Sequence, residues 1–171
     1  NVDLRLSVVV PVYNEVLFLP EAIRRIRAVS LAKEIILVDD GSTDGTRKLL
    51  ARIAAEELAM GPDFRADSLR VIFHETNQGK GAALRTGFRA ARGNVVLVQD
   101  ADLEYDPRDW PVLLKPILDG RADVVFGSRF TGGEHRVLFF RHYLGNLGLT
   151  LLSNFFTDLN QFECTWTLRI D

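Results

Sequence analysis

Four carboxylates follow one apolar run near the middle of the chain, in the stretch VVLVQDADLEYDP. The run stops at Asp100, and three acidic residues come at every second position after it, namely Asp102, Glu104 and Asp106. Because two carboxylates this close cannot both be ionised cheaply without a cation, Asp100 and Asp102 predict a site for Mg²⁺ or Mn²⁺. Such ions commonly bridge one or two carboxylates to substrate phosphates. Glu104 could add a third oxygen, and Asp106 before Pro107 is better explained as a helix cap. A solvated turn is the alternative explanation of Asp-x-Asp alone.

A glycine-rich turn with a lysine, NQGKG at 77–81, stands before a helical pattern. It is not a Walker A loop, because the earlier glycine is missing and no Ser or Thr follows Lys80. It also lacks the third glycine of a dinucleotide fingerprint, where Leu84 stands instead. What remains is a glycine-rich helix start with a lysine, which suits an anionic ligand. A simple N-terminal helix cap is the alternative.

Five apolar segments with almost no alternation are typical of buried parallel strands, at 6–13, 34–40, 69–74, 94–100 and 122–128. Helical patterns lie between them, at 20–29, 46–58, 81–92 and 107–120. The alternation of strand and helix predicts an α/β, doubly wound domain with a mostly parallel sheet and helices on both faces.

Polar clusters follow all five predicted strands, at 11–15, 39–42, 77–81, 100–102 and 127–129. Because ligands bind beyond the carboxyl ends of strands in open α/β sheets, we expect these clusters to share one site. Asp39 and Asp40, which precede the turn at Gly41, either cap that turn or hydrogen-bond a ribose or a base. The shared position of the clusters is a stronger signal than any one of them.

A further helical pattern at 137–157 is apolar except for one polar stripe, made of His142, Asn146, Thr150, Ser153 and Thr157. The pattern fits two roles equally well: a helix buried in the core, or a helix in contact with lipid. No uninterrupted apolar stretch is long enough to span a bilayer. We expect no signal peptide at the start, because a strand-like segment begins within a few residues. Because it begins without Met and ends without a stop signal for an element, we expect a piece of a longer protein.

The composition suits one globular domain. The 171 residues are 47% hydrophobic, and the formal net charge of -2 provides no global basic field for nucleic acid. The one cysteine, Cys164, offers neither a disulfide framework nor zinc spacing.

Five stretches occur in one order along the chain: VVVPVYNE, ILVDDGSTDGT, NQGKGAALRTGF, VLVQDADLEYDP and DVVFGSRF. Together they resemble family 2 glycosyltransferases of the GT-A fold. Within that family they are most similar to dolichyl-phosphate mannose synthases and bacterial polyprenyl-phosphate glycosyltransferases. The resemblance covers about Leu6 to Phe130 closely. The tail TDLNQFECTWTLRID departs from the family's pattern.

The resemblance implies a role for each matching residue. The nucleotide-sugar would be bound by Pro11, Tyr13, Glu15, Asp39, Asp40, Lys80 and Asp100. The metal on the diphosphate would be held by Asp100 and Asp102, with Glu104 as the third ligand. Asp102 and Arg129 would be the catalytic residues, and Arg129 would meet a phosphate of the donor or the acceptor. Arg136 and Arg141 are further candidates for contact with that phosphate.

The function implied is a metal-dependent, inverting transfer of a hexose from GDP-mannose or a UDP-sugar to a polyprenyl or dolichyl phosphate. Such an enzyme is expected at the cytoplasmic face of a membrane. Residues 1–136 would form the catalytic core, and 137–171 an amphipathic helix and a divergent tail of the same domain.

Two alternatives stay open. One is a soluble sugar acceptor, with Glu163 as the candidate base. The other is a catalytically silent module that binds the nucleotide-sugar. A nucleotidyltransferase is disfavoured, because such enzymes usually carry a glycine-rich basic loop directly after the first strand. In this chain the stretch PVYNE at 11–15 stands there instead.

Overall fold

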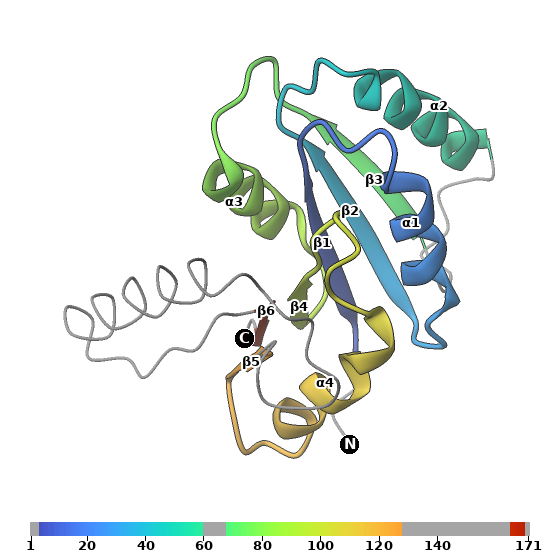
Figure 1. Cartoon of the computed structure of the whole chain (residues 1–171). Helices are drawn as coiled ribbons and strands as arrows, with labels where there is room; N and C mark the ends of the chain where they lie inside the picture. The colour runs from blue at the N-terminus through green and yellow to red at the C-terminus, as the bar shows by residue number, and fades with distance from the viewer. Residues whose placement is uncertain (1–3, 60–67, 128–164, 170–171) are drawn as a thin grey trace, which may run out of the picture.

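The core of the molecule is a six-stranded sheet, shown in Figure 1. The computed structural model describes residues 4–59, 68–127 and 165–169. The strands are β1 (Leu6–Val12), β2 (Lys33–Asp39), β3 (Ser68–Phe73), β4 (Val95–Val98), β5 (Val124–Gly127) and β6 (Thr165–Arg169). Their order across the sheet is β3-β2-β1-β4-β6-β5. β1 is parallel to β2 and β4, and β2 is parallel to β3, whereas β6 is antiparallel to β4 and β5. The predicted mostly parallel sheet is therefore confirmed.

The helices also lie where the sequence predicted them. They are α1 (Leu19–Ala28), α2 (Thr46–Ala59), α3 (Lys80–Ala90) and α4 (Trp110–Leu118), with a 3-10 turn η1 (Pro107–Asp109) before α4. The predicted helix at 137–157 lies outside the described residues, so its role stays a prediction. No helix in the described part of the chain combines the length and hydropathy needed to cross a membrane.

The sequence analysis missed β6, because it treated this segment as part of a divergent tail. β6 lies between β4 and β5 and pairs with both, for instance Leu97 with Thr167 and Val125 with Thr167. A strand of five residues forms through its pairing with strands that are distant in the sequence, which local patterns do not report. The sheet thus takes strands from both segments proposed above, while the boundary at residue 136 itself stays a prediction.

Both faces of the sheet are covered by helices. On one face, Val8 and Val10 of β1 pack in a cluster with residues of α1, α2 and α4, including Ile26, Leu50 and Trp110. On the other face, Val9 packs in a second cluster with the residues of α3, as Figure 1 shows from the position of that helix. This alternation follows from the two-residue period of a strand, and it explains why the strand sequences are apolar throughout.

α3 lies unusually close to β1 because Gly87 carries no side chain. A Cβ atom built at Gly87 would lie 2.3 Å from Cγ1 of Val9, a distance that real Cβ atoms do not show. The close packing fixes α3 over the sheet. The first residue of α3, Lys80, is thereby held near the carboxyl ends of β1 and β4.

Candidate active site

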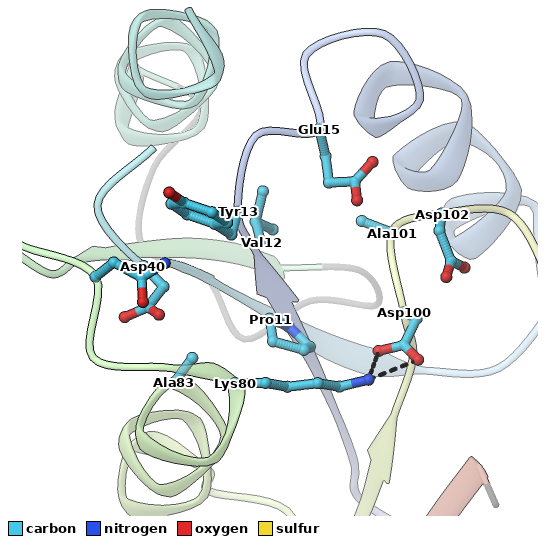
Figure 2. Close-up of a pocket in the computed structure, with 11 residues that line it drawn as sticks. Pro11, Val12, Tyr13, Glu15, Asp40, Lys80, Ala83, Asp100, Ala101 and Asp102 are labelled. Carbon is cyan, nitrogen blue, oxygen red and sulfur yellow. Dashed lines mark hydrogen bonds and ion pairs between the residues drawn. The ribbon is translucent and has the colours of Figure 1, made fainter. Parts of the chain in front are cut away.

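A cavity lies at the carboxyl ends of β1, β2 and β4, as Figure 2 shows. Its lining comprises Pro11, Val12, Tyr13, Glu15, Asp40, Asn77, Lys80, Ala83, Asp100, Ala101 and Asp102. The fold therefore brings together four of the five polar clusters that follow the predicted strands. Arg129, Arg136, Arg141 and Glu163 lie outside the described residues, so their roles stay predictions.

The lining also contains residues that the sequence analysis did not single out. Asn77, Ala83, Val12 and Ala101 contribute to the walls of the cavity. Asn77 could have been found, since it opens the polar cluster that follows β3. Val12 and Ala101 lie inside the predicted clusters at 11–15 and 100–102, whereas Ala83 gave no signal, because apolar residues on helices usually pack in a core.

The acidic side of the cavity is formed by Glu15, Asp100 and Asp102 (Figure 2). Burial raises the pKa of Glu15, and the nearby carboxylates of Asp102, Asp44 and Asp100 raise it further. Burial is the largest cause, and the part due to the three carboxylates reflects a local excess of negative charge. The acidic side of the cavity therefore favours a positive ligand.

Lys80 supplies a positive charge to this side. Its side chain runs from the start of α3 past Pro11 to Asp100, as Figure 2 shows. The Lys80 Nζ atom lies 2.7 Å from Oδ1 and 2.9 Å from Oδ2 of Asp100. The lysine is 60% exposed and the aspartate 19% exposed, so the pair lies at the mouth of the cavity.

The buried side chain of Gln99 holds the loop that carries Asp100 and Asp102. The Gln99 amide nitrogen donates hydrogen bonds to the backbone oxygens of Asp100 at 3.2 Å and Tyr105 at 3.1 Å. Its amide oxygen accepts a hydrogen bond from the indole nitrogen of Trp110 at 3.0 Å. The position of the two aspartates is thus tied to the hydrophobic core through one polar side chain.

The predicted helix cap at Asp106 is confirmed. Its side chain accepts a hydrogen bond from the backbone N–H of Arg108 at the start of η1. The hydrogen bonds from the Arg108 guanidinium and backbone hold the pKa of Asp106 below its ordinary value. Asp106 therefore serves the local structure and does not line the cavity.

Asp100 and Asp102 line the cavity, but Glu104, the third metal ligand expected from the sequence, does not. Glu104 is exposed and is not part of the cavity lining, and its backbone N–H donates to Asp102 at 3.1 Å. Within the described residues, no three His, Cys, Asp or Glu side chains gather so that they could hold a metal ion together. Two carboxylates are nevertheless a sufficient protein contribution for Mg²⁺ or Mn²⁺, because substrate phosphates and water complete the shell. The Lys80 ammonium group lies against Asp100 at this position.

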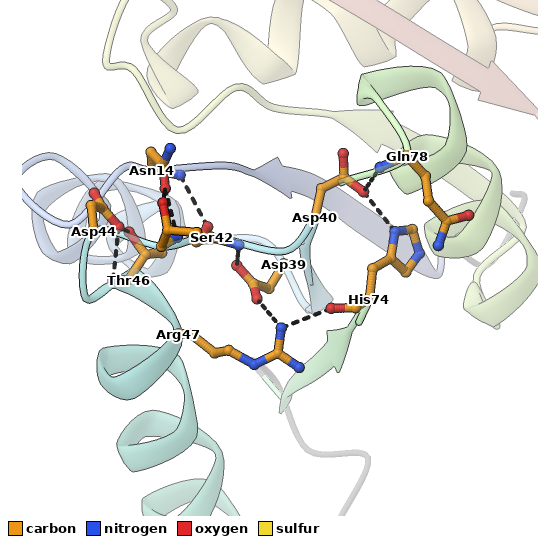
Figure 3. A network of polar contacts seen from close by, with 10 residues as sticks. Asn14, Asp39, Asp40, Ser42, Asp44, Thr46, Arg47, His74 and Gln78 are labelled. Atoms are coloured by element: carbon orange, nitrogen blue, oxygen red, sulfur yellow. Dashed lines mark hydrogen bonds and ion pairs between the residues drawn. The ribbon is translucent and has the colours of Figure 1, made fainter. Parts of the chain in front are cut away.

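Asp39 does not line the cavity, although the sequence analysis placed it with Asp40 on the nucleotide. Its fully buried carboxylate accepts hydrogen bonds from the Ser42 backbone at 3.3 Å and from the Arg47 guanidinium at 3.2 Å. Arg47 also donates to the backbone oxygen of His74 at 2.7 Å (Figure 3). These contacts match the alternative in which Asp39 caps the turn.

Asp40 lines the cavity and also holds the loop that leads to α3. It accepts hydrogen bonds from the backbone N–H groups of Gln78 at 3.0 Å and Gly79 at 2.8 Å. The Nδ1 atom of His74 lies 2.7 Å from the same carboxylate, as Figure 3 shows. Burial alone would raise the pKa of Asp40, but the hydrogen bonds from Gln78, His74 and Gly79 outweigh it, so the pKa is lowered. Asp40 is therefore held as a carboxylate.

The turn after β2 positions the loop after β1. The Ser42 hydroxyl accepts a hydrogen bond from the Asn14 backbone at 3.0 Å, and the Thr46 hydroxyl accepts one from the Glu15 backbone at 3.0 Å. Asp44 accepts one from the Val16 backbone at 3.2 Å. These three side chains hold the backbone at Glu15 and at its two neighbours, and the Glu15 side chain lines the cavity.

Comparisons with known proteins bear on the family and the fold of this chain. The model of the family "Glycosyl transferase family 2" matches residues 7–170. An undecaprenyl-phosphate 4-deoxy-4-formamido-L-arabinose transferase from Aeromonas hydrophila is 38% identical over 130 residues, which cover 73% of this chain and 37% of that protein. The enzyme of the same name from Pseudomonas syringae is 43% identical over 114 residues, or 64% and 31% of the two chains. The chain thus spans about a third of the length of the curated relatives it matches.

Solved structures show the same fold. The mannosyltransferase PcManGT from Pyrobaculum calidifontis, in complex with GDP-Man and Mn²⁺, has a TM-score of 0.58 and 30% identity over 71% of this chain and 34% of its own. TarS from S. aureus has a TM-score of 0.58 and 23% identity over 78% of this chain and 38% of its own, which supports the fold alone. The predicted GT-A fold is confirmed by these neighbours. Because the family model matches residues 7–170 of a chain of 171, the chain belongs to glycosyl transferase family 2.

Proposed function

We propose that this chain carries the donor-binding and catalytic core of a metal-dependent, inverting glycosyltransferase whose acceptor is a polyprenyl phosphate. The observation that carries the proposal is the placement of Asp100, Asp102 and Lys80 in one cavity with Tyr13 and Asp40. That cavity lies at the carboxyl ends of parallel strands, where open α/β sheets bind their ligands.

Different residues of the cavity would contact different parts of the donor. Tyr13 is 46% exposed at the lip, where its ring can lie against a nucleoside. Lys80 is placed to meet the diphosphate, because it starts α3 and its amine reaches Asp100 at the mouth of the cavity. Asp100 and Asp102 would hold Mg²⁺ or Mn²⁺, and such an ion, when bound, offsets the charge that develops on the departing nucleoside diphosphate.

The acceptor half of the proposal rests on the names of the relatives, which are undecaprenyl-phosphate sugar transferases. A phosphate acceptor is already anionic near neutral pH, so it needs little help from a general base to attack the anomeric carbon. Arg129 would then position an anion rather than move a proton. Because such an acceptor resides in a membrane, we place the enzyme at the cytoplasmic membrane face.

The proposal is tested by a screen of donors and acceptors. The protein is incubated with vesicles containing polyprenyl phosphate, Mn²⁺ or Mg²⁺, and labelled GDP-mannose, UDP-glucose or UDP-N-acetylhexosamines. We expect one donor to give a labelled lipid product. A donor that is bound without turnover would support the silent module, and transfer to soluble sugars without any lipid would support the soluble acceptor. The first result would overturn the proposed activity, and the second would overturn the proposed acceptor.

A further inference from the structure

The Lys80–Asp100 ion pair uses the same oxygens that a divalent cation needs. The ammonium lies within 3 Å of both Asp100 oxygens, at 2.7 and 2.9 Å. Lys80 is also the one basic residue in the lining of the cavity, as far as the chain is described. An ammonium and a divalent cation at one carboxylate repel each other, so the two cations compete for Asp100.

The pair has little value as a structural link. Lys80 is 60% exposed, and exposed ion pairs contribute little to the stability of a fold. The start of α3 is held instead by the backbone hydrogen bonds from Gln78 and Gly79 to Asp40. Lys80 can therefore swing away from Asp100 on its flexible stem while its backbone stays in place.

A diphosphate gives the ammonium another partner. Lys80 stands at the first position of α3, where free backbone N–H groups and the helix dipole favour an anion. A phosphate bound there would draw the ammonium from Asp100, and both oxygens of Asp100 would then be available to the metal. Diphosphate and metal would each promote the binding of the other.

We propose that Lys80 is a counter-cation that neutralises Asp100 in the absence of the donor and releases it to the metal when the donor diphosphate binds. The inference rests on the proposed function, since it takes the ligand to be a nucleotide-sugar diphosphate. In this proposal Lys80 contacts the nucleotide and also couples the binding of the donor diphosphate to the binding of the metal.

The test measures metal binding without any turnover. Free Mn²⁺ is titrated by electron paramagnetic resonance against the protein alone, for the wild type, Lys80→Met and Lys115→Met. Lys115→Met is the matched control, because Lys115 is also exposed, also pairs with an aspartate, and lies on α4 away from the cavity. We expect Lys80→Met to bind Mn²⁺ about 5- to 10-fold more tightly than the wild type, a common size for coupling between sites. We expect Lys115→Met to match the wild type.

The second measurement adds GDP or UDP, with correction for the Mn²⁺ that the free nucleotide binds. In the wild type the diphosphate should tighten Mn²⁺ binding, and in Lys80→Met this gain should be smaller by the same 5- to 10-fold factor. A Lys80→Gln variant repeats the comparison, and circular dichroism checks that each variant is folded.

The outcomes separate the two claims. If Lys80→Met and Lys80→Gln bind Mn²⁺ no more tightly than Lys115→Met, the counter-cation role is overturned whatever the nucleotide does. Undetectable Mn²⁺ binding in every variant has the same consequence. If the Lys80 variants bind Mn²⁺ more tightly but neither diphosphate nor any donor binds, the proposed function fails while the competition at Asp100 stands.

Discussion

The imidazole of His74 lies 2.7 Å from the carboxylate of Asp40, and this contact joins the residue after β3 to the residue after β2. The other ring nitrogen lies 2.9 Å from the Thr86 hydroxyl on α3. Through these contacts a buried histidine ties two strand ends to the helix that carries Lys80. The position of the lysine in the cavity thus depends on a residue that does not line it.

Replacement of His74 by Ala should loosen the start of α3. The change leaves the buried Asp40 carboxylate with one hydrogen bond fewer, so we expect the free energy of unfolding to fall by about 1–3 kcal/mol. Urea denaturation measures this loss, and nucleotide affinity should fall with it. Thr86→Val removes only the second ring contact and should cost less than half as much. Equal losses in the two variants would show that the Asp40 contact is not the one that matters.

The contribution of Asp40 to stability should depend on pH. Its pKa in the folded protein lies below the ordinary value of 3.8, so the folded state favours the ionised form. A carboxylate of this kind stabilises the fold above its unfolded pKa, and the contribution is lost as the pH falls through the folded pKa. The difference in the free energy of unfolding between the wild type and Asp40→Asn should therefore shrink as the pH falls below about 4. Asp123→Asn, at an exposed site, serves as the control. A difference that does not change with pH would contradict this account.

Gly87 should not tolerate even one methyl group. Because a Cβ atom there would lie 2.3 Å from Val9, Gly87→Ala must push α3 away from β1. Overpacking of this kind costs about 1–3 kcal/mol, and thermal unfolding would measure it. Gly81→Ala in the same helix is the control, since nothing lies within 4 Å of its Cβ position. That variant should be neutral or slightly more stable, because alanine favours a helix by up to about 1 kcal/mol. Equal melting temperatures for both variants would rule out the close packing.

Gln99→Leu should disturb the loop of Asp100 and Asp102 without touching either residue. The amide of Gln99 holds the backbone oxygens of Asp100 and Tyr105, and the substitution leaves both without this donor. We expect a loss of about 1–3 kcal/mol in stability and weaker binding of Mn²⁺ by titration. Trp110→Phe removes the indole contact to Gln99 and part of a buried ring, so it should lower stability. Because the hydrogen bonds from Gln99 to the loop remain, Mn²⁺ affinity should stay closer to that of the wild type than in Gln99→Leu. Unchanged metal affinity in Gln99→Leu would contradict the bracing role.

The strands and helices around the cavity could be predicted because each carries its own local signal. The apolar runs, the helical periodicity and the Asp106-Pro107 cap require no knowledge of distant residues. The convergence of Tyr13, Lys80 and Asp100 also followed, since parallel strands end at one edge of the sheet.

The remaining features depend on contacts between distant parts of the chain. Asp39 and Asp40 are neighbours, yet the first is buried beside Arg47 and only the second lines the cavity. Successive side chains of a strand point to opposite faces of the sheet, so Asp39 and Asp40 are expected on different sides. The sequence alone does not say which of the two sides faces the cavity. β6 depends on pairing with β4 and β5, and His74 gains its role only from Asp40 and Thr86.

The central claim is that Asp102 takes part in metal-dependent glycosyl transfer. The most direct test is the initial rate of labelled sugar transfer to polyprenyl phosphate, measured against Mn²⁺ concentration for the wild type, Asp102→Asn and Asp109→Asn. Asp109 is an exposed acidic residue of η1 that does not line the cavity, so its variant makes the same change elsewhere. We expect the rate of Asp102→Asn to fall by at least about 100-fold. Substitution of a residue that only hydrogen-bonds a metal ligand already lowers metal affinity or activity by about 10- to 100-fold, and a ligand itself should matter more. Asp109→Asn should keep the wild-type rate. Transfer by Asp102→Asn at the wild-type rate, with the same Mn²⁺ dependence, would contradict the account.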